Sequence, residues 1–200
     1  MKLTDVAFIL IVFKLSVSWC TAANDCDTTV TEANDCILED ADFPNGDFEM
    51  GDKYWEQIAP LGYEISTDSA YTGDQSMKVD MTYPLRGGAT TTIYFDHDNE
   101  PNRVSLRACS KAVDVSTGGD SSERYCLSCH TTNTLGVIEG PFLANFTVGT
   151  HDWEEKELSI KSKGDHCISK LVCECLVMFR TGTIYFDSIT MKQGNCKGEV

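Results

Sequence analysis

Hydrophobic positions from Phe43 onward recur in short runs rich in β-branched and aromatic residues. Gly, Asn and Asp separate these runs, at a spacing typical of β-sandwiches. The sequence has no stretch of sustained helical periodicity, no internal repeat and no low-complexity segment. Eight strands are therefore predicted, over Gln75–Met81, Ala89–Phe95, Arg103–Val115, Glu123–Thr131, Gly140–Val148, Glu155–Ile160, Ser169–Arg180 and Thr183–Lys192.

The same pattern predicts one core-facing strand side and two turns. Glu174 and Arg180 fall on even positions within 171–180, so we assign to the core the odd positions, which carry Cys173, Cys175, Val177 and Phe179. Thr117–Asp120 and Thr181–Gly182 contain the glycine and polar residues of tight turns. They predict hairpins between the strands that flank them.

The first residues have the pattern of a secretory signal peptide. Lys2 supplies a positive start, eight apolar residues follow over Val6–Phe13, and small residues surround Ala22. Lys14 ends the apolar run well short of the roughly 20 residues that a bilayer core requires, so membrane insertion is not expected. We predict a secreted, extracellular protein, divided into a signal peptide 1–22, a polar Cys-containing tail 23–42, a domain 43–193 and a C-terminal tail 194–200.

Cysteine content fits an oxidising compartment, in which disulfides persist. Loss of Cys20 with the signal peptide leaves an odd number, so one thiol is free or joins a second chain in a disulfide-linked dimer, unless cleavage falls before Cys20. The sequon Asn145-Phe146-Thr147 predicts a glycoprotein with Asn145 on the surface. The disulfide candidates are Cys26, Cys36, Cys109, Cys126, Cys129, Cys167, Cys173, Cys175 and Cys196.

Composition and charge exclude several partners. The net charge of -15 comes from 31 Asp and Glu against 16 Lys and Arg. Phosphate binding needs clustered Lys or Arg, and the sequence has no such cluster, so nucleic acid and anionic membrane surfaces are excluded as partners. A hydrophobic content of 42% excludes wholesale disorder.

Five segments carry a family resemblance. The run Phe43–Gly51 reads Asn-Gly-x-Phe-Glu-x-Gly from Asn45 and is followed by Trp55. With Tyr71–Val79, Val104–Ala108, Thr147–Trp153 and Thr183–Met191 in that order, the chain resembles the jelly-roll carbohydrate-binding modules of the galactose-binding-domain-like superfamily.

The resemblance spans about Pro44 to Gln193 and implies an all-β jelly-roll sandwich. About eight to nine antiparallel strands, stabilised by disulfides, are expected. Cys36 and Cys196 would join two ends that this fold brings close. A meprin-type adhesion domain, a related jelly roll, is the alternative at the level of fold.

The resemblance also implies roles for particular residues. In such modules the Glu of the opening motif and the Asp of the last strand commonly hold a structural calcium ion, and these are Glu49 and Asp187 here. The alternative is that both are solvated acids at strand ends, because calcium needs six to eight oxygen ligands. Residues expected to face inward and close the core are Phe48, Trp55, Phe186 and Ile189.

Sugar-contacting positions vary too much in such modules to be assigned from the resemblance. Trp55 and Trp153 are expected to pack structurally, since large aromatic side chains are most often buried. Exposed aromatic candidates are Tyr54, Tyr63, Tyr71, Tyr83 and Tyr94, and their polar neighbours are Asp96, His97, Asp98 and Asn99.

One sharper motif is set aside. Cys126-Leu127-Ser128-Cys129-His130 matches the haem-attachment pattern and, with Cys173 and Cys175, resembles a zinc or redox pair. Plain disulfides are favoured because the chain is predicted to be secreted and rich in strands. If Thr117–Asp120 is a hairpin turn, Cys109 lies opposite the region of Cys126 and Cys129, which makes a cross-strand bridge reasonable.

Catalytic motifs are missing from the sequence, so no enzyme activity is expected. Two functional hypotheses remain. One is a secreted module that binds glycan or adheres to extracellular matrix protein. The other is an acidic structural protein of an extracellular or biomineral matrix, such as a skeleton or shell, that binds a mineral surface.

Overall fold

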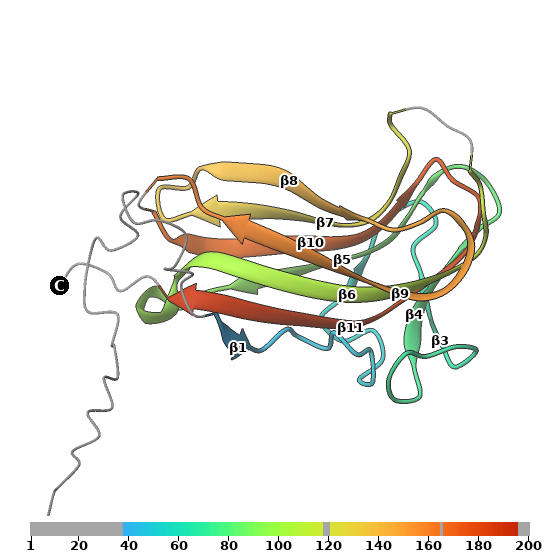
Figure 1. The fold of residues 1–200 in the computed structure, drawn as a ribbon, viewed down its shortest axis with the longest axis horizontal. Coiled ribbons are helices and arrows are strands. Elements are labelled where there is room, and N and C mark those ends of the chain that lie inside the picture. The colour runs from blue at the N-terminus through green and yellow to red at the C-terminus, as the bar shows by residue number, and fades with distance from the viewer. Residues whose placement is uncertain (1–37, 118–120, 165, 196–200) are drawn as a thin grey trace, which may run out of the picture.

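Two antiparallel sheets pack face to face in the computed structural model, which describes residues 38–117, 121–164 and 166–195 (Figure 1). Sheet A has the order β3-β4-β11-β6-β9, with β1 also paired to β11, and sheet B has the order β2-β5-β10-β7-β8. Sheet A contains β1 (Glu39–Ala41), β3 (Glu64–Ser66), β4 (Ser76–Met81), β6 (Pro101–Val115), β9 (Gly149–Lys161) and β11 (Gly182–Asn195). Sheet B contains β2 (Glu56–Gln57), β5 (Arg86–Tyr94), β7 (Arg124–Asn133), β8 (Ile138–Asn145) and β10 (Ile168–Met178).

The predicted all-β sandwich is confirmed, and each of the eight predicted strands is present. The described residues contain three further strands, β1, β2 and β3, so the total exceeds the expected eight to nine. These strands have two or three residues each, which is too short to show a period in the sequence. β1 lies within the segment 23–42 and pairs with β11.

Both predicted hairpins are wrong. β6 and β7 flank Thr117–Asp120 but belong to different sheets, and so do β10 and β11, which flank Thr181–Gly182. The turn residues mark a change of direction, but they do not determine whether the chain returns beside its own strand or crosses to the other layer. In a sandwich, a chain that crosses to the other sheet places two consecutive strands on opposite sides of the core and buries the inward face of each.

The core lies between the two sheets and contains the residues predicted to close it. Phe48, Trp55, Phe186 and Ile189 are buried, as expected. On β10 the odd positions Cys173, Cys175 and Val177 are fully buried, which confirms the predicted inward face. Phe179 is the exception, with 45% exposure, because it follows the end of β10 at a positive φ of 58°.

The opening motif folds into a turn held by its own side chains. Asn45 donates from Nδ2 to the carbonyls of Gly51 and Lys53 and accepts from the Met50 N–H. Gly46 lies against β11, where an added Cβ would stand 2.0 Å from the Ile189 carbonyl oxygen. This position therefore requires glycine, and the turn brings the first part of the domain onto the last strand.

One disulfide joins the central strands of sheet B. Cys129 on β7 and Cys173 on β10 are register partners, and both are buried. The suggested bridge from Cys109 is wrong, because Cys109 lies on β6 in sheet A as a thiol, Cys129 is bonded to Cys173, and Cys126 is also a thiol. Thiols among the described residues are Cys109, Cys126, Cys167 and Cys175.

Cys26, Cys36 and Cys196 lie outside the described residues. Glu39 faces Gln193 in the β1–β11 register, three residues from Cys36 and from Cys196 respectively. Peptide mapping under non-reducing conditions tests the predicted Cys36–Cys196 bridge directly.

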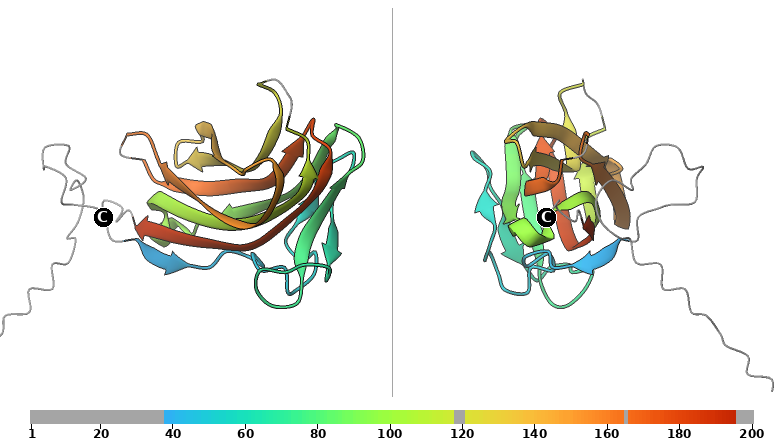
Figure 2. Two further views of the ribbon diagram at one scale, coloured as in Figure 1. Left: turned by 45° about the vertical axis from the view of Figure 1, so that its right-hand side comes forward. Right: turned by 90° about the vertical axis from the view of Figure 1, so that its left-hand side faces the viewer.

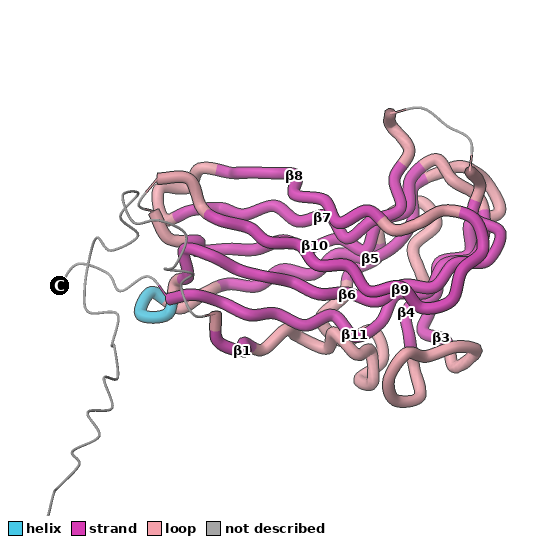
Figure 3. The backbone as a smooth tube through the Cα atoms, in the orientation of Figure 1, coloured by secondary structure: helices cyan, strands magenta, loops and turns pink. Residues whose placement is uncertain are grey.

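The sandwich is curved. Figure 2 shows the strands of both layers bending toward the side on which sheet B lies, so the outward face of sheet B is on the concave side. The backbone trace in Figure 3 is almost entirely strand and loop, with one short 3₁₀ helix, η1 (His97–Asn99), at one end. In the described part of the chain, no helix is long and apolar enough to cross a membrane.

Candidate ligand-binding site

A pocket of about 380 Å³ lies at the end of the sandwich where β1, β5, β11 and η1 meet. β1 and β11 belong to sheet A and β5 to sheet B, so both layers contribute residues to the pocket. This is the left-hand end of the molecule in Figure 1. The residues that line it are Asp40, Ala41, Asp42, Ile93, Tyr94, Phe95, Asp96, Asn99, Met191 and Gln193.

The end of β5 places the aromatic and polar groups of this pocket. Tyr94 is opposite Lys170 on the outward side of sheet B, and it is 76% exposed. The chain then turns, since Phe95 donates its N–H to the Ser169 carbonyl and Asn99 donates its N–H to the Asp96 carbonyl. Tyr94, Asp96 and Asn99 are thus brought together by one short segment.

Three of the predicted sugar-contact candidates therefore meet in this pocket. Tyr94, Asp96 and Asn99 line it, whereas His97 and Asp98 are exposed on η1 and are not among the lining residues. Three further polar lining residues were not predicted: Asp40 on β1, Asp42 directly after it, and Gln193 on β11. No local signal identifies them, because β1 is three residues long and only the sheet pairing carries it to β5.

The pocket is acidic. Asp40, Asp42 and Asp96 line it, and no Lys or Arg is among the lining residues. Lys192 lies 3.3 Å from Asp40 and offsets part of this charge from outside the pocket. A ligand in this pocket must therefore tolerate or prefer a negative surrounding potential.

The remaining tyrosine candidates are scattered. Tyr63 is half-buried, donates its hydroxyl to the Trp55 carbonyl at 3.2 Å, and has its pKa raised to about 12, mainly by burial. Tyr54 and Tyr83 are exposed in loops, and Tyr71 packs against Trp153 with ring centroids 5.7 Å apart. Among the five candidates, Tyr94 alone lines the pocket.

Trp55 has a structural role, as expected. Its indole is buried, and its Nε1 donates to the Asn45 carbonyl at 3.0 Å. It also packs against Phe48, with ring centroids 5.2 Å apart. This ring belongs to the core and is not available to a ligand.

The predicted metal ligands Glu49 and Asp187 hold the same loop. Glu49 Oε1 accepts the N–H groups of Asp74 and Gln75, each at 2.8 Å. Asp187 Oδ2 accepts the N–H groups of Tyr71 and Thr72 at 2.6 and 3.0 Å. The two carboxylates therefore hold the segment Tyr71–Gln75 from its two ends.

Asp187 is a buried carboxylate in an acidic neighbourhood. Its Oδ1 also accepts the Ser188 N–H at 2.5 Å, and no Lys, Arg or His forms an ion pair with it within the described ranges. Burial raises the pKa of Asp187 and nearby Asp47 raises it further, while the three N–H donors lower it. A cation at this point would offset the buried charge.

The number of acidic ligands is small for a calcium site. No group of three or more Asp, Glu, His or Cys side chains that could hold a metal forms in the part of the chain that the structure describes. With two carboxylates, main-chain carbonyls and water would have to complete the six to eight oxygens that calcium needs. The donors fit calcium by charge and by atom type.

Strand geometry separates the Cys-x-x-Cys-His motif. On β7 the Cys129 side chain faces the core, whereas Cys126 belongs to a second buried cluster with Ile58 and Leu176. Because residues three apart on a strand point to opposite faces, Cys126 and Cys129 cannot bind one ion together.

No family model matches the chain, and no curated protein matches it. The CBM22-1 xylan-binding domain of Paenibacillus barcinonensis Xyn10C is similar in structure, with a TM-score of 0.54 and 16% identity over 76% of this chain and 93% of that one. The chain has the jelly-roll fold of carbohydrate-binding modules.

Two further solved structures share this fold. TmCBM61, in complex with β-1,4-galactotriose, has a TM-score of 0.54 and 10% identity, over 76% of this chain and 97% of that one. The CBM22-1–GH10 modules of the Clostridium thermocellum xylanase Xyn10B, complexed with xylohexaose, have a TM-score of 0.53 and 15% identity, over 79% of this chain and 28% of that one. The matches thus include both binding domains and a module that is part of an enzyme.

Proposed function

We propose that this protein binds a carbohydrate in the pocket at Tyr94. The observation that carries the proposal is that Tyr94, which is 76% exposed, lines one pocket of about 380 Å³ together with Asp and Asn residues. Sugars have an apolar ring face and a rim of hydroxyl groups. A tyrosine ring suits the apolar face, and oxygens of Asp and Asn accept hydrogen bonds from the hydroxyls.

The charge of the pocket favours a neutral glycan. Asp42 and Asp96 line it without a Lys or Arg among the lining residues, so sulfate or uronate groups would be repelled. The structural neighbours support this class, since one is described as xylan-binding and another was solved with galactotriose. The protein is proposed to act without catalysis and outside the cell, supported by its signal-like N-terminus and its disulfide.

Affinity electrophoresis in gels with soluble polysaccharides tests this proposal. The wild type is expected to be retarded by a neutral polysaccharide such as uronate-free xylan or galactan and not by an anionic one. Tyr94→Ala should remove the retardation, whereas Tyr83→Ala, at a tyrosine that is also exposed but does not line the pocket, should leave it unchanged. Equal retardation of both variants and the wild type would overturn the site, and no retardation on any polysaccharide would overturn the function.

A structural calcium ion held by Glu49 and Asp187 is a second part of the proposal. It would offset the buried charge of Asp187 and fix the Tyr71–Gln75 loop, which both carboxylates already contact. Millimolar calcium is expected to raise the melting temperature of the wild type and not that of Asp187→Asn. Magnesium serves as the control ion, because it demands a smaller, near-ideal octahedral shell and gives up its water reluctantly. An unchanged melting temperature in calcium would overturn this part.

The alternative function, an acidic structural protein of an extracellular or biomineral matrix, rests on net charge. Several acidic side chains on the outward face of sheet A are already paired, as Glu64 and Asp68 are with Lys78 and Glu157 is with Arg107. Pairing reduces the number of carboxylates free to meet a mineral. Depletion of the protein from solution by calcium carbonate powder would favour the alternative.

A further inference from the structure

Asn145 stands on the outward, concave side of sheet B. It is the last residue of the edge strand β8, it is exposed, and its register partner on β7 is Cys126. Directly opposed residues of an antiparallel pair point to the same face. Cys126 lies on the outward side, because its neighbours Tyr125 and Leu127 belong to the main core and it does not.

The rest of the sequon is fixed to the fold. Phe146 is buried against Tyr125, with ring centroids 5.3 Å apart. Thr147 donates its N–H and its hydroxyl to the two oxygens of Glu154, at 2.9 and 3.0 Å. Asn145 is thus presented to solvent by a turn that its own neighbours hold in place.

One apolar side chain, Leu143, is partly exposed beside Asn145. Ile58, Cys126 and Leu176 form a small buried cluster on the outward side of sheet B, and half-buried Leu143 packs against it. Leu143 is two residues from Asn145 and on the same side of β8. The apolar face of a sugar attached to Asn145 would find its contact surface on Leu143, because the other members of the cluster are buried.

We propose that Asn145 carries an N-linked glycan that lies over the β7–β8 half of this concave face, and so closes that half to external ligands. His130 is on the same side of β7, four residues from Cys126, or about 14 Å along the strand. On this face the glycan covers the side chains that are still partly exposed, among them Leu143 and His130.

The glycan leaves the Tyr94 pocket open. Asn145, Cys126, Leu176 and Gly88 lie in one row across the sheet, and Tyr94 is six residues farther along β5. At strand spacings of about 4.8 Å and rises of about 3.4 Å per residue, Tyr94 is roughly 25 Å from Asn145. The inference therefore stands independently of whether the pocket binds carbohydrate.

Secretion from eukaryotic cells followed by hydroxyl-radical footprinting tests the proposal. The full chain, before and after release of N-glycans by peptide-N-glycosidase F, is compared by mass spectrometry. Release of the glycan is expected to raise oxidation of Leu143 and His130 several-fold and to leave that of Tyr94 unchanged. The enzyme acts after folding and leaves Asp in place of Asn145, so the comparison requires no variant that could fail to fold.

Variants assign the effect to this sequon. Thr147→Ser keeps both the acceptor sequence and the hydroxyl that contacts Glu154, so it should behave as the wild type does. Asn145→Gln should lack the glycan mass and show the high Leu143 oxidation without enzyme treatment. A wild type without a glycan at Asn145 would overturn the modification, and an unchanged Leu143 after release would overturn its position over the sheet.

Discussion

Two pairs of carboxylates in this acidic protein have contrasting environments. Asp187 and Glu49 accept main-chain N–H groups of the Tyr71–Gln75 loop, and Asp187 is fully buried. Asp42 and Asp96 line an open pocket, and neither forms an ion pair within the ranges that the structure describes. The first pair is part of the fold, and the second is available to a ligand.

The comparison shows what distinguishes a structural acid from a candidate binding acid in a chain with many acids. The N–H groups of an irregular loop need acceptors, and a nearby carboxylate supplies strong ones. At the pocket the main-chain groups are used by strand pairing and by the turn at η1, so the carboxylates have no such partner to satisfy. Net charge alone cannot separate these cases.

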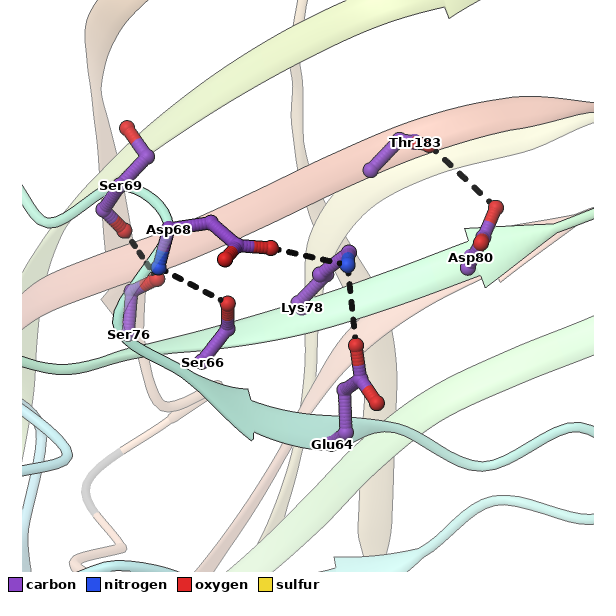
Figure 4. Close-up of polar contacts among 8 residues, drawn as sticks. All are labelled: Glu64, Ser66, Asp68, Ser69, Ser76, Lys78, Asp80 and Thr183. Atoms are coloured by element: carbon purple, nitrogen blue, oxygen red, sulfur yellow. Dashed lines mark hydrogen bonds and ion pairs between the residues drawn. The ribbon is translucent and has the colours of Figure 1, made fainter.

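A third set of acids is paired with basic side chains. In Figure 4, Lys78 on β4 reaches Glu64 and Asp68, each at 3.0 Å, and Thr183 on β11 donates to Asp80. Ser66 and Ser76 fix the intervening loop through the Asp68 N–H and the Ser69 carbonyl. These acids are intermediate between the other two sets, because they are partnered but exposed.

The largest effect is expected at Asp187. Asp187→Ala removes the acceptor of three N–H groups at a fully buried site, so the free energy of unfolding should fall by roughly 2–4 kcal/mol. Urea denaturation measures this change. Asp47→Ala is the control, since Asp47 makes one exposed contact of 3.4 Å and should cost far less. Equal losses in both variants would contradict the structural role.

The stability of the wild type should also depend on pH through Asp187. Its pKa is raised in the folded state, so between the unfolded pKa of about 3.9 and the folded pKa the native protein binds more protons than the unfolded chain. Stability from this group is therefore highest below about pH 4 and falls as pH rises through the folded pKa. Denaturation at several pH values should show this fall relative to Asp187→Asn, and a relative rise would refute it.

Glu49 should matter less. Glu49→Ala removes the acceptor of two N–H groups at an exposed site, for which about 1–2 kcal/mol is expected. Glu49→Gln keeps one oxygen that accepts both donors and should lose less than half as much. If the two substitutions cost the same, the charge and not the acceptor geometry holds the loop.

Lys78→Met tests the paired acids and should cost no more than about 1 kcal/mol, because exposed ion pairs contribute little. The pKa of Lys78 is raised by Glu64 and Asp68, so its contribution is complete below about pH 10 and is lost as pH rises through its folded pKa. The pKa of Asp68 is lowered by Lys78, so the stability that Asp68 gains from this ion pair is lost as pH falls below about 4. A stability difference that is constant across this range would contradict the pairing.

Much of the fold follows from the sequence, because long strands with turn residues between them have a strong local signal. The interior positions of Phe48 and Trp55 and the inward face of β10 were predictable for that reason. The crossings after β6 and β10 were not, since turn chemistry does not specify the layer to which a strand returns. The partner of Cys129 depends on those crossings and could not be predicted from spacing.

The candidate site was predictable only in the part that one segment supplies. Tyr94, Asp96 and Asn99 are close in the sequence and meet in the pocket. Asp40 and Asp42 reach the pocket through the pairing of β1 with β11. This pairing involves only three residues of β1, which show no hydrophobic alternation in the sequence. Long-range strand pairing, and not residue type, decides which acids line the pocket together with Tyr94.

The smallest change in stability is expected at the pocket acids. Asp96→Asn and Asp42→Asn alter exposed or half-exposed side chains without an ion-pair partner in the described residues, so the free energy of unfolding should stay within about 0.5 kcal/mol of the wild type. Their effect should appear in selectivity instead. With both charges removed, the repulsion of anionic polysaccharide weakens, while the Tyr94 ring still binds neutral polysaccharide. Affinity electrophoresis on paired neutral and anionic gels measures both. If the double variant still distinguishes neutral from anionic polysaccharide, the pocket acids do not cause the selectivity. The proposed difference between structural carboxylates and carboxylates available to a ligand would then be wrong.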